Sequence, residues 1–131
     1  MTETTRPPDM EPALRTLAMP ADANPNGDIF GGWVLAQMDL AGGVAAAGRA
    51  GGRTVTVAVE AMRFHAPIAV GDLVTCYARV VKSGRTSITV AIETWARRRR
   101  GPTEVRVTEG TFIYVAIDEE GRPRPLPEEA A

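Results

Sequence analysis

One apolar helical segment followed by four strand-like segments is the feature that most constrains this chain. From Gly31 to about Arg49, apolar residues recur at separations of three to four, which predicts a helix. Four later segments repeat with a period of two and are rich in β-branched and aromatic residues: 54–64, 72–82, 86–96 and 104–117. One helix followed by a run of strands predicts an α+β fold, in which an antiparallel sheet packs on a central helix.

Short connections between the last three strand segments favour antiparallel pairing. The links are 83–85 and the longer 97–103, and both suit hairpins. A short first strand is predicted within 13–20, where Pro20 ends the run.

The length of 131 residues is that of a single domain. The two ends of the chain are polar and contain several prolines. We therefore expect one domain over 13–118, with a flexible N-terminal tail over 1–12 and a Pro-rich C-terminal tail over 119–131.

The predicted helix is rich in small residues, with the run LAGGVAAAG over 40–48. Gly42 and Gly43 together cost a helix roughly 1–2 kcal/mol relative to alanine. The sequence therefore predicts that another part of the chain approaches the helix backbone closely, with the sheet as the simplest candidate.

Composition excludes several classes of function. A net charge of −1 gives no general reason to expect binding to nucleic acid or to a membrane surface. Cys76 is the only cysteine and His65 the only histidine, which excludes an internal disulfide and argues against a resident transition metal. No stretch approaches the roughly 20 apolar residues of a membrane span, and the polar N-terminus does not resemble a signal peptide. We expect a cytoplasmic protein.

Three stretches of the sequence resemble the YciA-type acyl-CoA thioesterases of the hotdog superfamily, which are related to cytosolic acyl-CoA hydrolase. One is a loop of the form N-x-x-G-x-x-x-G-G that leads into a helix carrying Q-M-D, with matches at Asn24, Gly27, Gly31, Gly32, Gln37, Met38, Asp39 and Gly43. The other two are the segments 55–72 and 110–127. The resemblance covers most of 13–127.

The resemblance implies a hotdog fold, in which five or six antiparallel strands wrap around the helix. It implies hydrolysis of acyl-CoA to a carboxylic acid and CoA, with no resident cofactor. A carboxylate of the central helix, here Asp39, would act as general base or nucleophile. The helix N-terminus would donate a backbone N–H to the thioester carbonyl. Dimers, commonly assembled into hexamers as trimers of dimers, are implied as well.

Two glycines at the start of the predicted helix suit this chemistry. The carbonyl oxygen of a thioester becomes an oxyanion in the transition state, so preorganised N–H donors stabilise it. A helix N-terminus offers unsatisfied N–H groups, and Gly31 and Gly32 would let a substrate approach them. The alternative is a glycine turn that only begins a helix.

Asp39 lies too far along the helix to serve the same substrate as those glycines. It follows Gly31 by eight residues, or roughly 12 Å at about 1.5 Å per residue. Two antiparallel helices would bring Asp39 of one protomer to the Gly31–Gly32 end of its partner. We therefore predict an obligate dimer with two composite sites. The alternative for Asp39 is an exposed helix edge, or a bond to nearby backbone.

Two polar residues of the preceding loop are further candidates. Asp28 precedes Gly31 by three residues, so it is either a helix N-cap or a second catalytic group. Asn24 either holds the loop through its own backbone or places a polar group beside the thioester.

Binding of CoA phosphates requires basic groups and backbone N–H donors. A glycine turn supplies both, and we expect it to bind CoA through Lys82, Ser83, Gly84, Arg85 and Thr86. Arg63 is a further candidate. The arginine run 97–100 is interpreted as a solvated hairpin loop, with phosphate binding as its alternative.

Other readings of the chain are weaker. No G-x-S-x-G elbow is present, and Cys76 lies in a strand pattern typical of a small core residue. The run DANPN is similar to the D-x-N-P-H motif of hotdog enoyl-CoA hydratases, but Asn26 replaces its histidine, so His65 would have to act instead. A non-catalytic acyl-CoA sensor is the other alternative, against which the acid at Asp39 argues.

Overall fold

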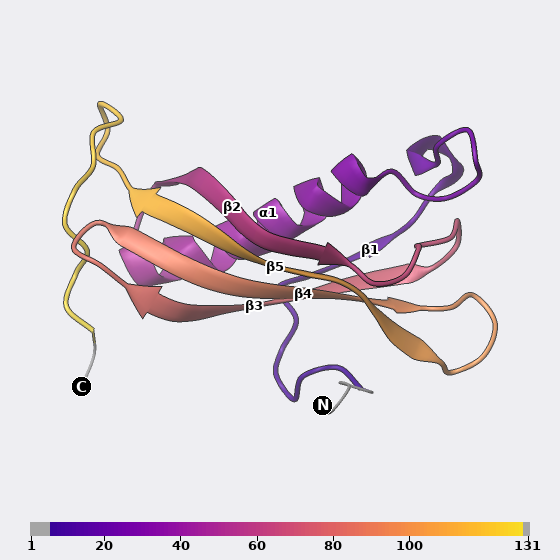
Figure 1. Cartoon of the computed structure of the whole chain (residues 1–131). Helices are drawn as coiled ribbons and strands as arrows, with labels where there is room; N and C mark the ends of the chain where they lie inside the picture. The colour runs from indigo at the N-terminus through magenta and orange to yellow at the C-terminus, as the bar shows by residue number, and fades with distance from the viewer. Residues whose placement is uncertain (1–5, 130–131) are drawn as a thin grey trace.

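The computed structural model describes residues 6–129 and shows one helix packed on one five-stranded antiparallel sheet (Figure 1). The helix α1 spans Gly31–Ala50, after a single 3-10 turn at Pro20–Asp22. The strands are β1 Leu14–Leu17, β2 Thr54–Phe64, β3 Leu73–Ser83, β4 Ser87–Arg97 and β5 Glu104–Ala116. The predicted packing of an antiparallel sheet on a central helix is confirmed, and the four long strands begin and end within one residue of the predicted segments.

The strands are ordered β1-β3-β4-β5-β2 across the sheet. The hairpin partners β3–β4 and β4–β5 lie at its centre, as the short links predicted. The strand β2 follows α1 in the chain, pairs with β5 and forms one edge of the sheet. Residues far apart in the sequence, on β2 and β5, are therefore direct neighbours.

The core lies between α1 and the face of the sheet that it covers. The buried side of the helix includes Val34, Met38, Ala41 and Ala46, which pack with buried residues of β4 and β5. The helix ends where Gly51 adopts a left-handed conformation with φ of 68° and donates its N–H to the Ala47 carbonyl.

Close packing at Gly42 explains one of the two helix glycines. A Cβ added at Gly42 would overlap the Tyr114 hydroxyl and would lie 2.7 Å from Ile92 Cδ1. At Gly43 the same atom would meet nothing within 4 Å in the described part of the chain. The predicted close approach of the sheet is confirmed at Gly42 alone.

Apolar side chains remain exposed on the edge strand β2 and on α1. Val55, Val57 and Val59 of the edge strand β2 are between 40% and 55% exposed, and Leu40 and Val44 of α1 are each 61% exposed. These side chains and the unpaired edge of β2 form the surface that we call the β2–α1 face. The other edge strand, β1, has only four residues.

The described part of the C-terminal segment contacts the domain. The Leu126 N–H donates to the Arg85 carbonyl at 2.9 Å, and Arg124 Nη2 donates to the Ala50 carbonyl at 3.0 Å. Residues 1–5 and 130–131 of the two expected tails lie outside the described residues. The division into one domain and two flexible tails stays a prediction.

None of the helices within residues 6–129 is long and apolar enough to cross a membrane. The cytoplasmic location stays a prediction.

Candidate active site

The Asp39 carboxylate is held by two hydroxyl groups from the sheet. Its Oδ1 accepts a hydrogen bond from Thr56 Oγ1 at 2.6 Å and another from the Tyr114 hydroxyl at 3.0 Å. The Tyr114 hydroxyl also lies 3.1 Å from the Asp39 main-chain oxygen. Within residues 6–129, Oδ2 accepts no hydrogen bond and no cation pairs with the carboxylate. One oxygen of Asp39 is therefore fixed, and the other is unengaged.

The pairing of β2 with β5 brings these two hydroxyls together. Thr56 lies directly opposite Tyr114 in the antiparallel register, and both side chains face α1. A register shift follows directly after Thr56 on β2. Thr56 and Tyr114 are missed by the sequence analysis, because no local pattern shows which residues of two distant strands will meet under a helix.

The environment keeps the Tyr114 hydroxyl protonated. Burial raises the pKa of Tyr114 far above its ordinary value, and the hydrogen bond to the Asp39 carboxylate raises that pKa further. Tyr114 is only 2% exposed. The phenol is therefore a permanent donor to Asp39 around neutral pH.

The start of α1 offers two backbone N–H groups. The N–H groups of Trp33 and Val34 donate to the Phe30 carbonyl at 3.1 and 3.3 Å, whereas those of Gly31 and Gly32 find no acceptor in the described residues. The Phe64 ring lies against Gly31, and a Cβ added at Gly32 would enter open space. The helix spacing puts this end roughly 12 Å from Asp39. A single chain does not bring the two candidate groups together.

The loop before the helix is held by Asn24. Its Oδ1 accepts hydrogen bonds from the N–H groups of Asn26 at 2.9 Å and Asp28 at 3.2 Å. The loop-holding role predicted for Asn24 is confirmed. The prediction of Asp28 as helix cap is wrong, because Phe30 is the N-cap residue and Asp28 lies in a bridge with Ala69. Asp28 lies two residues before Phe30 and therefore outside the first turn of α1.

The turn Lys82–Thr86 connects β3 to β4 at the end of the sheet where Tyr114 lies. Ser83, Ile88, Tyr114 and Thr56 are successive neighbours across the four long strands. Lys82, Gly84 and Arg85 are exposed in this turn, and within residues 6–129 neither basic side chain forms an ion pair. The side-chain oxygen of Ser83 is buried without a partner in the described residues.

Arg63 lies elsewhere. Its neighbour Phe64 faces α1, so Arg63 points to the opposite face of the sheet. There it lines a cavity of about 260 Å³ together with charged residues of β3, β4 and β5: Arg79, Glu93, Arg106 and Glu109. The structure does not bring Arg63 near Asp39 or the Lys82–Thr86 turn.

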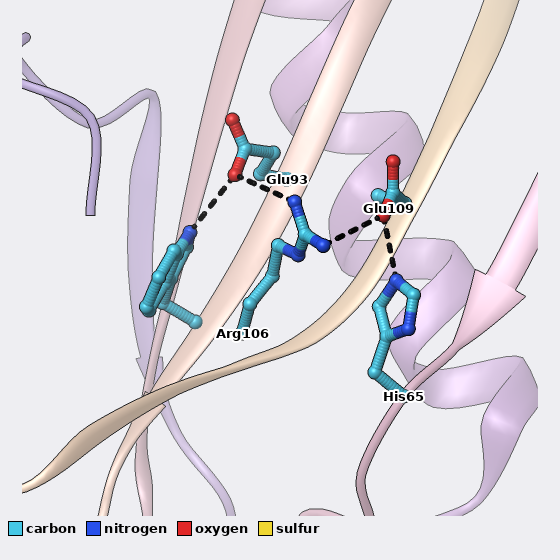
Figure 2. A network of polar contacts seen from close by, with 5 residues as sticks. His65, Glu93, Arg106 and Glu109 are labelled. Atoms are coloured by element: carbon cyan, nitrogen blue, oxygen red, sulfur yellow. Dashed lines mark hydrogen bonds and ion pairs between the residues drawn. The ribbon is translucent and has the colours of Figure 1, made fainter. Parts of the chain in front are cut away.

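A network of ion pairs crosses this outer face (Figure 2). His65 Nε2 lies 2.6 Å from Glu109 Oε2, and Arg106 lies 3.1 Å from the same oxygen. Arg106 also reaches Glu93 at 3.9 Å, and Glu93 accepts from Trp95 Nε1 at 3.3 Å. His65 is thus engaged away from Asp39, as a structural role predicts, and it does not support the hydratase reading.

The arginine run contains a structural residue that the sequence analysis missed. Arg98 Nη1 lies 2.6 Å from Asp72 Oδ2 and donates to the Pro67 carbonyl at 3.0 Å. Asp72 is only 2% exposed and also accepts the Ala69 N–H at 2.9 Å. Arg98 therefore compensates a buried carboxylate, and it is not a free group of a solvated loop.

Cys76 is a core residue, as predicted. It is fully buried, and its Sγ lies 3.4 Å from Thr94 Oγ1. Burial raises the pKa of the Cys76 thiol to about 11, although the Thr94 hydroxyl lowers it slightly. Among the described residues, no group of three His, Cys, Asp or Glu side chains is arranged to hold a metal ion.

Comparison with known proteins identifies the family. The sequence model of the protein family described as the thioesterase superfamily matches residues 26–103. The acyl-CoA thioester hydrolase YciA of Salmonella typhimurium is 54% identical over 130 residues, which cover 97% of this chain and 98% of the relative. The chain belongs to the YciA family of hotdog-fold acyl-CoA thioester hydrolases. YciA of Escherichia coli K12 is 51% identical over 132 residues, covering 98% of this chain and all of the relative.

Solved structures of this family share the fold closely. A hexameric thioesterase from Yersinia pestis superimposes with a TM-score of 0.89 at 54% identity, covering 93% of this chain and 99% of that one. A hexameric broad-specificity acyl-coenzyme A thioesterase, solved as an aspartate-to-alanine mutant, superimposes with a TM-score of 0.87 at 48% identity. That match covers 91% of this chain and 88% of the other.

Cys76 should react slowly with a thiol reagent in the folded protein. With a pKa of about 11, about 0.1% of the thiol is ionised at pH 8, and the group is also buried. We expect little labelling of native protein by an aromatic disulfide reagent, faster labelling as the pH rises toward 11, and full labelling after unfolding. Cys76→Ala should keep thioesterase activity. A folded Cys76→Ala protein without activity would contradict the structural role of Cys76.

Proposed function

We propose that this chain hydrolyses acyl-CoA thioesters to a carboxylic acid and CoA, with Asp39 as the catalytic carboxylate. The observation that carries the proposal is the geometry of Asp39, whose Oδ1 is fixed by Thr56 and Tyr114 while Oδ2 is unengaged in the described residues. Membership of the YciA family supports the substrate class. An aspartate-to-alanine mutant of a solved relative is consistent with a functional aspartate in this family.

The donors at Asp39 suit a base or a nucleophile. Both are neutral hydroxyls, so they orient the carboxylate without neutralising its charge. As a base, Oδ2 would take a proton from a water that attacks the thioester carbon. As a nucleophile, it would attack that carbon to form an anhydride that water then hydrolyses. On either route the C–S bond breaks, and the sulfur of CoA leaves as a thiolate that takes up a proton.

The start of α1 supplies the oxyanion contacts in this proposal. The N–H groups of Gly31 and Gly32 lack acceptors in the described residues and lie at the positive end of the helix dipole. The open space beside Gly32 leaves room for the thioester carbonyl. Asn24, half-buried in the adjacent loop, and Asp28 are secondary candidates for positioning substrate or water.

A dimer is needed to combine the two halves. The distance of roughly 12 Å along α1 separates Asp39 from Gly31 within one chain. The β2–α1 face, with its exposed valines and the unpaired edge of β2, supports pairing with a second copy. We propose a homodimer with two composite sites, and the hexameric relatives support its further assembly into a trimer of dimers.

The Lys82–Thr86 turn is the proposed site for the phosphates of CoA. Lys82 and Arg85 are exposed there without ion-pair partners in the described residues, at the Tyr114 end of the sheet. Arg63 lies on the opposite face of the sheet, so it is the weaker candidate.

Replacing Asp39 tests the reaction itself. Asp39→Asn keeps an oxygen that accepts hydrogen bonds but loses the base and nucleophile, so hydrolysis should fall by about 10²–10⁴-fold. Release of the CoA thiol from acyl-CoAs of several chain lengths measures turnover, and calorimetry measures CoA binding, which should persist. Asp9→Asn, the same change at an exposed residue of the N-terminal segment, is the matched control. Unchanged turnover in Asp39→Asn would end the assignment.

Mixing two inactive variants tests the composite site. In Gly32→Leu the new side chain should fill the open space beside residue 32 and block the oxyanion contact. Asp39→Asn removes the base. A heterodimer of the two has one doubly defective site and one intact site. After co-refolding at equal concentrations, activity should return to about a quarter of the wild-type value, because half of the dimers are mixed. No recovery in a sample shown by mass spectrometry to contain heterodimers would exclude sites shared between chains.

Neutralising the turn tests the CoA contact. Arg85→Ala should raise the KM for acyl-CoA by about 10-fold, because a charge-assisted bond to phosphate is lost. The KM for an acyl-pantetheine, which lacks the nucleotide phosphates, should stay the same. Arg63→Ala is the comparison. If Arg63→Ala raises the KM for acyl-CoA and Arg85→Ala does not, the phosphates bind on the face of the sheet that carries Arg63.

A further inference from the structure

Tyr114 lies where a single hydroxyl can set the direction of the Asp39 carboxylate. We propose that Tyr114 is a positioning residue, which holds Oδ1 of Asp39 so that Oδ2 alone is presented to the substrate. The inference rests on the proposed role of Asp39 and adds a residue outside the loop and helix motif. It concerns orientation, because the phenol itself is not expected to touch the reacting atoms.

Two contacts with the same residue give Tyr114 this role. Its hydroxyl lies 3.0 Å from the Asp39 Oδ1 and 3.1 Å from the Asp39 main-chain oxygen. Through the second contact, the same hydroxyl is also held beside the helix backbone, so the position of the Asp39 carboxylate is fixed relative to its own helix. A carboxylate held in this way has one preferred rotation about its terminal bond, which is the property that a directional base requires.

The phenol itself has little freedom to move. It is 2% exposed, its ring stacks on Phe112 with centroids 6.4 Å apart, and its hydroxyl packs against Gly42. Thr56, the other donor, lies on the edge strand β2 and is exposed in the single chain. Of the two donors, Tyr114 is therefore the more confined one. Its raised pKa keeps the proton on the hydroxyl, so the contact with Oδ1 persists.

Gly42 is the structural condition for this contact. It lies three residues after Asp39, on the buried side of α1, and the absence of a side chain is what admits the Tyr114 hydroxyl. Any side chain at this position would displace the hydroxyl from the helix. Gly42 is thus connected to the direction of the Asp39 carboxylate.

Tyr114→Phe removes the hydroxyl and keeps the ring. Misdirection of the catalytic carboxylate should lower kcat by about 10–100-fold. The KM should change little and the melting temperature should stay close to that of the wild type, since the ring still fills its site and Thr56 still binds Oδ1. Steady-state kinetics and thermal unfolding of the intact oligomer, with Asp39→Asn measured beside it, give these values.

A second pair of variants separates positioning from packing. Gly42→Ala should also lower kcat, because the added methyl displaces the hydroxyl. In the Tyr114→Phe background the same change should lower kcat by a smaller factor than in the wild type, because the hydroxyl is already absent and only the contacts of the added methyl with Ile92 Cδ1 and the ring carbon Cζ remain. Gly48→Ala, an exposed helix position with open space around the added atom, is the matched control and should keep full kcat.

The outcomes distinguish this inference from the proposed function. If Asp39→Asn is inactive while Tyr114→Phe keeps the wild-type kcat, Tyr114 has no positioning role and the catalytic assignment of Asp39 stands. If Asp39→Asn keeps wild-type turnover, both proposals are wrong. A Tyr114→Phe protein whose KM and melting temperature deteriorate together with kcat would show that the hydroxyl serves folding, which also overturns the inference.

Discussion

The close packing of Tyr114 against Gly42 brings the sheet up to α1 beside Asp39, and the candidate site depends on that contact. The hydroxyl can reach the helix only because Gly42 has no side chain. From there it contacts both the backbone and the carboxylate of Asp39. A helix displaced from the sheet by one methyl group would lose this contact. The acid in this otherwise apolar helix is thus stabilised by hydrogen-bond donors from the sheet, Thr56 and Tyr114.

The carboxylates of the molecule differ in the partners that they bind. Asp72 is buried against Arg98. Glu109 lies between Arg106 and His65 (Figure 2), so both carboxylates have an arginine partner. Asp39 has only hydroxyl donors in the described residues. Ion pairs stabilise a carboxylate and make it a poor base, whereas neutral donors orient it and leave its charge available. This contrast distinguishes Asp39 from Asp72 and Glu109.

The proposed dimer would use the exposed apolar residues of the β2–α1 face. An edge strand with exposed valines beside exposed Leu40 and Val44 leaves apolar area in water. The spacing along α1 leaves Asp39 and the glycine N-terminus of one chain unable to meet. Association of two copies through the β2–α1 face would relieve both conditions. The hexameric relatives show that members of this family assemble into higher oligomers.

The sequence by itself determined the elements, because their signals are local. Hydrophobic periods of 3.6 and 2 define one helix and four long strands, and the family-like motif identifies Asp39, Asn24 and the glycine pair. Only the tertiary structure decided which residues meet across those elements. Thr56 and Tyr114 lie 17 and 75 residues from Asp39 and join it through strand register. The same holds for the contact of Arg98 with Asp72 and for the bridge of Asp28 with Ala69, since contacts between distant segments leave no period in the chain.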